Sequence, residues 1–240
     1  MTFANQWSRN YFSKLLKNFM TDGSSFNKLP RVFRSVFYNL SSKVTRSGIE
    51  PFVINNLSGL NGTICNLGCG NKRWAGEKNE ICVELFPKEG VDIIADIHVL
   101  PFSACYFDAC VLTEVLEHLQ NPQKAVDEIY RVLKERGRLI LTTRFIFPLH
   151  DAPKDYYRFT EFGIRELLKD FSSVEVYPQH DWFTTLVVLV MRTITEKDPV
   201  AKIISPLFVA LSLGLLPLKP IFSLFGFKDI TSGYFVLAEK

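Results

Sequence analysis

Short runs of apolar residues, separated by turn residues, dominate the chain from about residue 60 onward. Five of them precede residue 145: GTICNL (62–67), EICVEL (80–85), GVDIIAD (90–96), YFDACVL (106–112) and GRLILTT (137–143). Continuous apolar runs of this length are typical of strands buried on both faces of a parallel sheet. A helix is predicted between the last two runs, with Asn121 as N-cap, Pro122 at its first position and Arg136-Gly137 as its end. Alternating strands and helices predict an open, doubly wound α/β sheet.

The two ends of the chain show other patterns. Residues 7–20 and 31–44 carry apolar residues at helical spacing with basic residues between them, which predicts two amphipathic helices. SSVEVYP (172–178) and SGYFVLAEK (232–240) predict two further strands, separated by an apolar helical insertion at 182–227. We therefore expect basic helices over residues 1–58 and a sheet domain over residues 59–240.

Composition supports a globular chain and shows where its charge lies. The 240 residues are 47% hydrophobic and 22% charged, with a net charge of +3. Residues 1–50 contain eight Lys or Arg against Asp22 and Glu50, a local charge of +6 that leaves −3 for the rest. Such a basic arm indicates either an anionic surface as partner or a solvated helical face. Because the basic residues are confined to this arm and no recognition motif accompanies them, we expect no nucleic-acid partner.

The cysteines and the N-terminus bear on location. None of the five cysteines forms a C-x-x-C pair, and no histidine pair has metal-ligand spacing, so we expect no metal site. The cysteines are expected to be small buried hydrophobes in a reducing compartment. Basic residues at positions 9, 14 and 17 interrupt any apolar signal-peptide core, which predicts a cytoplasmic protein.

A glycine loop follows the first predicted strand. Gly68 and Gly70 are one residue apart, but Arg73 stands where a dinucleotide loop would carry its third glycine. The short stretch between Gly70 and the next strand leaves little room for a helix whose N-terminus could face a pyrophosphate. Glu84 ends the second strand, where a carboxylate can bind both ribose hydroxyls, and Asp96 ends the third, where one can accept from adenine N6. We therefore predict an adenosine ligand without phosphates, with S-adenosylmethionine as the main candidate.

These residues carry a family resemblance. NLGCG, VELFP and ADIHVLPFSACYFDACVLTEVLEHLQNPQKAVDEIYRVLKERGRLIL resemble a class I S-adenosylmethionine-dependent methyltransferase of the small-molecule, type 11 group. The continuation FPLHDAPKDYYRFTEFGIRELL resembles a subgroup linked to polysaccharide or cell-envelope synthesis. The family implies a Rossmann-like, mostly parallel seven-stranded sheet whose last strand is antiparallel. It implies S-adenosylmethionine as cofactor, bound by residues that match its motifs: Asn66, Gly68, Cys69, Gly70, Glu84, Leu85, Asp96, Ile97, Thr113, Glu114 and His118. Asn66 is a departure, because the family usually has an acid there.

The candidate catalytic residues follow the fifth strand. His150 and Asp151 lie at the sheet edge where the methyl group should point, so His150 could deprotonate an acceptor. The alternative is catalysis by proximity and orientation without a strong base. Tyr156, Tyr157 and Arg158 are candidate substrate contacts, while the tyrosines also suit simple packing. His118 likewise suits either the pocket or a helix surface.

The insertion contains sixteen residues without a charge, Ile203–Leu218, interrupted by two prolines and bracketed by Lys202 and Lys219. It is too short and too broken to span a bilayer, so it predicts either a patch that dips into the inner face of the membrane or a surface that packs on the sheet or on a second subunit. Three functions remain open. The first is methyl transfer to a small-molecule, glycan or lipid-linked acceptor; the second is an inactive S-adenosylmethionine-binding module; the third is a nicotinamide-dependent oxidoreductase, which Arg73 disfavours.

Overall fold

The computed structural model describes residues 42–75, 79–195, 214, 227 and 229–240. They belong to two compact units, Arg46–Thr185 with Phe225–Lys240 and Met1–Thr45 with Leu186–Leu224, and the first holds the whole sheet. The helix expected at 7–20, most of that at 31–44 and nearly all of the apolar segment 203–218 lie outside the described residues. The division expected at residue 58 stays a prediction; helix α4 (Ile49–Leu57) falls within the sheet unit. Among the helices that are described, none combines the length and apolar character needed to cross a bilayer.

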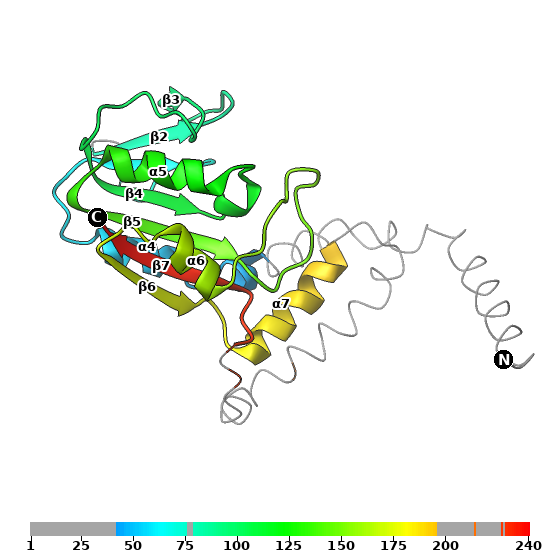
Figure 1. The fold of residues 1–240 in the computed structure, drawn as a ribbon. Helices are drawn as coiled ribbons and strands as arrows, with labels where there is room; N and C mark the ends of the chain where they lie inside the picture. Colours follow the sequence, from blue (N-terminus) through cyan, green and yellow to red (C-terminus); the bar gives the residue numbers. More distant parts are fainter. Residues whose placement is uncertain (1–41, 76–78, 196–213, 215–226, 228) are drawn as a thin grey trace, which may run out of the picture. The chain divides into compact units, whose positions relative to one another are not determined.

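A seven-stranded sheet organises the larger unit (Figure 1). The strand order is β3-β2-β1-β4-β5-β7-β6; the first five strands of this order are parallel, and β7 is antiparallel to both of its neighbours. The strands are β1 (Ile64–Leu67), β2 (Glu80–Glu84), β3 (Ile93–Ile94), β4 (Phe107–Thr113), β5 (Leu133–Arg144), β6 (Ser173–Pro178) and β7 (Gly233–Glu239). The predicted fold class is therefore confirmed.

Helices cover both faces of this sheet, which explains why its strands are continuously apolar. One face, with Leu67, Leu112 and Leu139, packs with α5 (Pro122–Val132) and α6 (Glu161–Leu167). The other face, with Ile140 among its residues, packs with α4. Figure 1 shows α5 and α6 in front of the sheet and α4 behind it. Leu139 and Ile140 are neighbours in β5 and both fully buried, and each such side chain contributes about 1.5–3 kcal/mol.

Helix α5 begins as predicted but ends earlier. The Asn121 side chain accepts a hydrogen bond from the backbone N of Lys124 at 3.2 Å, so the predicted N-cap is confirmed. The helix stops at Val132, because Leu133 pairs with Phe107 and starts β5. The end predicted at Arg136-Gly137 is wrong: this dipeptide lies inside β5, where the register with β4 shifts.

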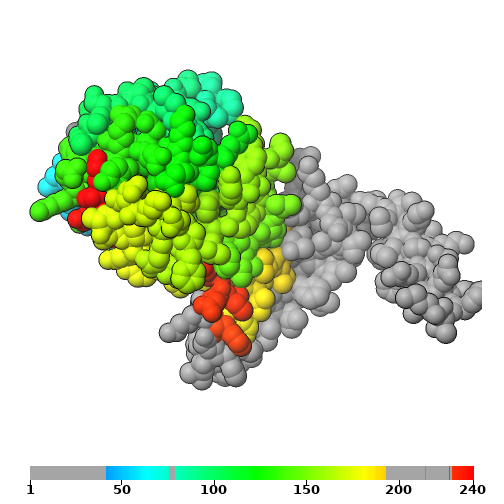
Figure 2. All heavy atoms as spheres, viewed as in Figure 1, coloured from blue at the N-terminus to red at the C-terminus, as the bar shows by residue number. Residues whose placement is uncertain are grey.

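The carboxyl ends of β1, β2, β4 and β5 meet at one edge of the sheet, since these strands are parallel. The one-turn helix η1 (Leu116–His118) follows β4 at this edge. The loop after β5, residues 145–160, extends from the same edge and is lime green in Figure 1. Figure 2 shows the yellow-green residues of this part of the chain at the molecular surface. Helix α7 (Trp182–Thr195) follows β6.

Candidate active site

The loop after β1 turns at two glycines in the left-handed region. Gly68 has φ +66° and Gly70 has φ +58°, values that favour glycine. A Cβ on Gly68 would come within 2.5 Å of Cγ2 of Val115, so only glycine fits there. A Cβ on Gly70 would meet no described atom within 4 Å, so the Gly70 backbone borders open space. The half of the loop nearest Gly70 can therefore approach a ligand closely.

Two carboxylates stand at the ends of the next two strands. Glu84 ends β2, and its Oε1 accepts a hydrogen bond from the Gly70 backbone N at 2.7 Å. Each carboxylate oxygen has two lone pairs, so this bond orients Glu84 and leaves acceptor capacity for ribose hydroxyls. Asp96 follows β3, and its Oδ1 accepts from the backbone N of His98 at 2.9 Å and lies 2.6 Å from His98 Nδ1. The backbone hydrogen bond from His98 is the main reason that the pKa of Asp96 is lowered, which keeps it an anionic acceptor.

Asn66 is explained by a buried carboxylate that sequence reasoning missed. Its Nδ2 donates to Oε1 of Glu80 at 2.6 Å and to the backbone O of Lys72 at 2.8 Å. Oε2 of Glu80 accepts from the backbone N of Trp74 at 2.7 Å and of Ala75 at 2.6 Å. Asn66 and Glu80 are 1% and 3% exposed. An acid at position 66 would have no protons to donate and would face a second buried carboxylate.

The end of the glycine loop does not form a dinucleotide cradle. Residues 68–75 contain turns and no helix, so no helix N-terminus in this stretch faces a pyrophosphate. Arg73 instead donates to the backbone O of Glu80 at 2.9 Å and forms an ion pair with Asp92 at 2.7 Å. Arg73 therefore ties the loop to the start of β2 and the turn after it.

Glu114, at the end of β4, is held in a strained conformation. Its φ of +57° is unusual for a residue with a side chain and costs about 1–3 kcal/mol. Its carboxylate accepts from Thr142 Oγ1 at 2.9 Å and forms an ion pair with the buried guanidinium of Arg144. These contacts hold Glu114, a predicted cofactor residue, against β5 and beside half-buried Thr113.

Glu117, His118 and His150 form a compact cluster next to Glu114. One potential ligand atom from each lies within 4.8 Å of the others. The Glu117 side chain is fully buried, and burial, with the nearby charge of Glu114 second, raises the pKa of Glu117 to about 8. Burial also lowers the pKa of His150. The role of His150 as a base stays a prediction, and Asp151 is exposed in the turn after it.

The loop that carries His150 is pinned by an internal ion pair. Arg158 binds Asp155 through both terminal nitrogens at 2.6 Å and donates to the backbone O of Pro148 at 2.9 Å. Burial opposes the ionisation of Asp155, but the hydrogen bonds from Arg158 and from the His150 backbone N outweigh it and lower its pKa to about 2. Arg158, a predicted substrate contact, is thus engaged in contacts that hold this loop together.

The structure brings the predicted site residues to one edge but distributes them between two groups. Gly68, Gly70 and Glu84 lie together at the ends of β1 and β2, with half-exposed Leu85 and Asp96 beyond them. The second group follows β4 and β5. In it, the hydroxyls of Tyr156 and Tyr157 bond to Gln120, at 3.0 and 3.1 Å. The remaining predicted cofactor residues flank the first group: Cys69 is buried and Ile97 packs against the core cluster.

Sequence reasoning missed Glu80, Glu117, Arg144 and Asp155. Glu117 carried a signal, because it adjoins His118 in the same motif. Asp155 carried one as well, since it lies three residues before Arg158. Glu80 and Arg144 carried no signal in the sequence, because their partners are distant in sequence or are backbone groups.

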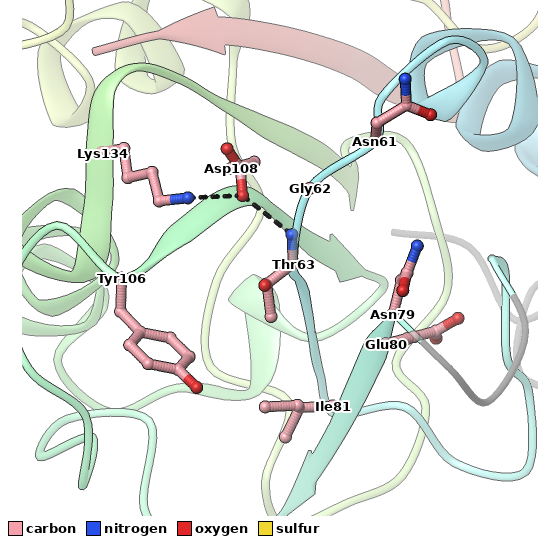
Figure 3. A pocket seen from close by; sticks show the side chains of 9 residues that line it. All are labelled: Asn61, Gly62, Thr63, Asn79, Glu80, Ile81, Tyr106, Asp108 and Lys134. Carbon is pink, nitrogen blue, oxygen red and sulfur yellow. Dashed lines mark hydrogen bonds and ion pairs between the residues drawn. The ribbon is translucent and has the colours of Figure 1, made fainter.

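A separate hollow of about 510 Å³ lies at the opposite edge of the sheet (Figure 3). Asp108 in its wall accepts from the backbone N of Thr63 and from Nζ of Lys134, each at 2.8 Å. These residues stand at the amino ends of β1 and β4, and at the start of β5. Ligands of open α/β sheets bind at the carboxyl ends, so this hollow is not the cofactor site.

Comparison with known proteins agrees with this geometry. Residues 66–141, about a third of the chain, match a family model described as a methyltransferase domain. A ubiquinone/menaquinone biosynthesis C-methyltransferase from Haemophilus ducreyi is 37% identical over 70 residues, 29% of this chain. The matched region spans 27% of that curated relative's length.

Solved structures share the fold. Phosphoethanolamine N-methyltransferase 2 from Haemonchus contortus, in complex with S-adenosyl-L-methionine, is similar with a TM-score of 0.53 and 16% identity. The similarity covers 84% of this chain and 56% of that one. The [4+2]-cyclase SpnF is similar over 80% of both chains, with a TM-score of 0.51 and 16% identity. The domain match and the shared fold support a class I S-adenosylmethionine-dependent methyltransferase domain with S-adenosylmethionine as its cofactor.

The Asn66–Glu80 pair yields a prediction about stability. Asn66→Asp should lower the free energy of unfolding by about 1–3 kcal/mol, because it replaces two buried donors by acceptors. Glu80→Gln in the same chain should recover part of this loss, since its amide can donate to the new carboxylate while its carbonyl accepts from Trp74 and Ala75. Urea denaturation of both single variants and the double variant measures the coupling. Additive losses would contradict the pairing.

The placement of Glu84 yields a prediction about the cofactor. Glu84→Ala should weaken S-adenosylmethionine binding by about 1.5–3 kcal/mol, the scale of a lost hydrogen bond to a charged group, and Glu84→Asp should cost less. Glu84→Gln can still accept from Gly70 and should fall between the wild type and Glu84→Ala. Isothermal titration calorimetry measures the affinities, with exposed Glu89→Ala as the matched control. Normal binding by Glu84→Ala would show that the ribose lies elsewhere.

Proposed function

We propose that this chain transfers the methyl group of S-adenosylmethionine to an oxygen, nitrogen or carbon atom of a small-molecule, glycan or lipid-linked acceptor. The main support is the placement of two carboxylates: Glu84 ends β2 and is hydrogen-bonded to the glycine loop, and Asp96 follows β3, the next strand of the sheet. This is the arrangement that an adenosine ligand without phosphates requires. The methyltransferase-domain match over residues 66–141 supports the same activity.

The geometry suggests how the chain would act. Glu84 would hold the ribose and Asp96 the adenine amine, while the backbone near Gly70 would pass close to the methionine portion. The bound cofactor would supply a methyl group activated by its sulfonium; an electron pair of the acceptor would take this methyl group as the carbon–sulfur bond breaks and the sulfur becomes a neutral thioether. A hydroxyl acceptor also loses its proton to solvent or to a nearby base. Aligning the two reactants supplies much of the acceleration in such a transfer.

A different reaction on the same cofactor-binding fold is the second candidate. One protein with a similar fold is a [4+2]-cyclase, so the fold by itself does not fix the chemistry. Asn66 stands where the family usually has an acid, which is the reason for considering an inactive S-adenosylmethionine-binding module. The buried Glu80 beside Asn66, however, supplies a carboxylate to the same loop. Arg73 stands in place of a third glycine, and no helix follows the loop within residues 68–75, so this region disfavours a nicotinamide enzyme. It does not distinguish a methyltransferase from another enzyme with the same cofactor-binding fold.

The class of acceptor rests on the sequence. The stretch Phe147–Leu168 carries the resemblance to the cell-envelope subgroup, and it supplies the loop that bears His150. The basic N-terminal region and the apolar segment 203–218 would suit peripheral contact with an anionic membrane, where lipid-linked sugars are found. A second subunit could cover the same apolar segment.

Ligand binding and product release test the activity. Full-length protein should bind S-adenosylmethionine and its demethylated product but not NAD in calorimetric titrations. It should then release the demethylated product with at least one member of a panel of phenols, amines, sugars and lipid-linked sugars. Binding without release across the panel would favour an inactive module, and binding of NAD would favour an oxidoreductase.

Flotation with liposomes tests the membrane contact. Full-length protein should float with anionic liposomes and much less with neutral ones, because basic residues near an anionic surface each add about 1 kcal/mol of attraction. Deleting residues 199–226 should abolish flotation while leaving S-adenosylmethionine binding intact. Full-length protein that stays monodisperse without detergent and ignores both kinds of liposome would contradict this proposal.

A further inference from the structure

The cluster of Glu117, His118 and His150 has the chemistry of a cation site. Glu117 and His118 belong to η1, directly after β4, and His150 lies in the loop after β5. The two imidazole rings meet edge to face, with their centroids 4.8 Å apart. Two imidazoles and a carboxylate are a common ligand set for divalent transition metals.

Glu117 is a buried carboxylate with one satisfied oxygen. Its Oε2 accepts from Thr143 Oγ1 at 3.0 Å. Its Oε1 is buried and has no hydrogen-bond partner among the described residues, and it lies 4.0 Å from His150 Nε2. Leaving a buried polar atom unsatisfied is costly unless something binds it. Oε1 therefore points into the cluster as an unused ligand atom.

Hydrogen bonds of the Nδ1 atoms leave Nε2 as the acceptor nitrogen of both histidines. Nδ1 of His118 lies 2.7 Å from the backbone O of Lys154, which can only accept, so Nδ1 carries the proton. Nδ1 of His150 lies 3.2 Å from Oδ2 of Asp155, which fixes the same tautomer. Arg158 also approaches this Nδ1, but at 3.5 Å, while it binds Asp155 at 2.6 Å.

This is the outer-sphere pattern of metal-binding histidines. In such sites the ring nitrogen that does not bind the metal donates to a carbonyl or carboxylate, which orients the ring and raises its basicity. Lys154 provides the carbonyl and Asp155 the carboxylate, and Arg158 holds Asp155 in turn. The supporting contacts of a site are thus present in addition to its three ligands.

We propose that Glu117, His118 and His150 together bind one divalent transition-metal cation. Ligands at about 2.1 Å from one ion lie about 3.0–3.4 Å apart, so the largest separation, now up to 4.8 Å, closes by about 1.5 Å on binding. Rotation of the half-buried side chains of His118 and His150 would supply that movement. Three protein ligands leave at least one coordination position of the cation open. An oxygen atom of the methyl acceptor takes this position; this part of the proposal rests on the proposed methyltransferase function. The proposal departs from the sequence-based expectation of no metal site.

Cobalt binding tests the site directly. Full-length protein is treated with a chelator, dialysed and titrated with Co²⁺, with absorption spectra and calorimetry as readouts and without cofactor or acceptor. We expect one Co²⁺ per chain, with d–d bands but no thiolate charge-transfer band. Glu117→Gln, His118→Gln and His150→Gln should each weaken binding at least tenfold. His98→Gln, which removes a histidine outside the cluster, should bind Co²⁺ as the wild type does.

The outcomes separate this proposal from the proposed function. S-adenosylmethionine affinity and the circular dichroism spectrum are measured on the same variants, and both should match the wild type for the isosteric Glu117→Gln. Loss of Co²⁺ binding with cofactor binding retained supports the cation site. Absence of stoichiometric binding by the wild type, a thiolate band, or unchanged affinity in the three variants overturns the cation site and leaves the methyltransferase proposal standing. Should one variant fail to fold, the other two still decide the result.

Discussion

Parallel pairing at the centre of the sheet determines where every candidate site residue can lie. Leu67 pairs with Val83 of β2 and with Leu112 of β4, so the residues that follow, Gly68, Glu84 and Thr113, stand at the same level of the sheet. β3 pairs with β2 through Glu84 itself, which places Asp96 two residues beyond that level. The register in turn depends on the apolar side chains buried on both faces.

A carboxylate serves the glycine loop from β2 instead of β1. Families of this type usually carry an acid at the position of Asn66, and its absence looks at first like a loss. The buried carboxylate of Glu80 faces Asn66 and accepts from the backbone of Trp74 and Ala75, so it fixes the loop from the neighbouring strand. The side-chain amide of Asn66 supplies the hydrogen-bond donor that this buried carboxylate needs. The Asn66–Glu80 pair thus places a buried carboxylate at the start of β2, beside the glycine loop.

Local patterns predicted the fold, and they placed the candidate cofactor residues at the strand ends where the structure has them; their role stays a prediction. Buried strands appear in the sequence as apolar runs, and Glu84 and Asp96 come at the ends of two of these runs. The order of residues along the chain was therefore enough to place both carboxylates at the edge of the sheet. The predicted end of α5 was wrong because Leu133 continues the helical spacing of apolar residues. Only its pairing with Phe107 shows that it belongs to β5. The group of residues that follows β4 and β5 was less predictable. Glu117 owes its character to burial and to Thr143, which a sequence without tertiary contacts does not reveal.

The two sides of the site are joined through the backbone of η1. The backbone O of Glu117 accepts from the N atoms of Tyr156 and Tyr157, at 3.0 and 3.2 Å, and His118 bonds to the carbonyl of Lys154. The loop after β5 is therefore fastened to the residues that follow β4, the strand beside the glycine loop. On the open side, the Lys154 ammonium lies 5.2 Å from the ring of Phe86, just beyond Glu84. A ligand that shifts this loop would have to move η1 with it or break these hydrogen bonds, and the Lys154–Phe86 contact would carry the shift to the residues just after Glu84.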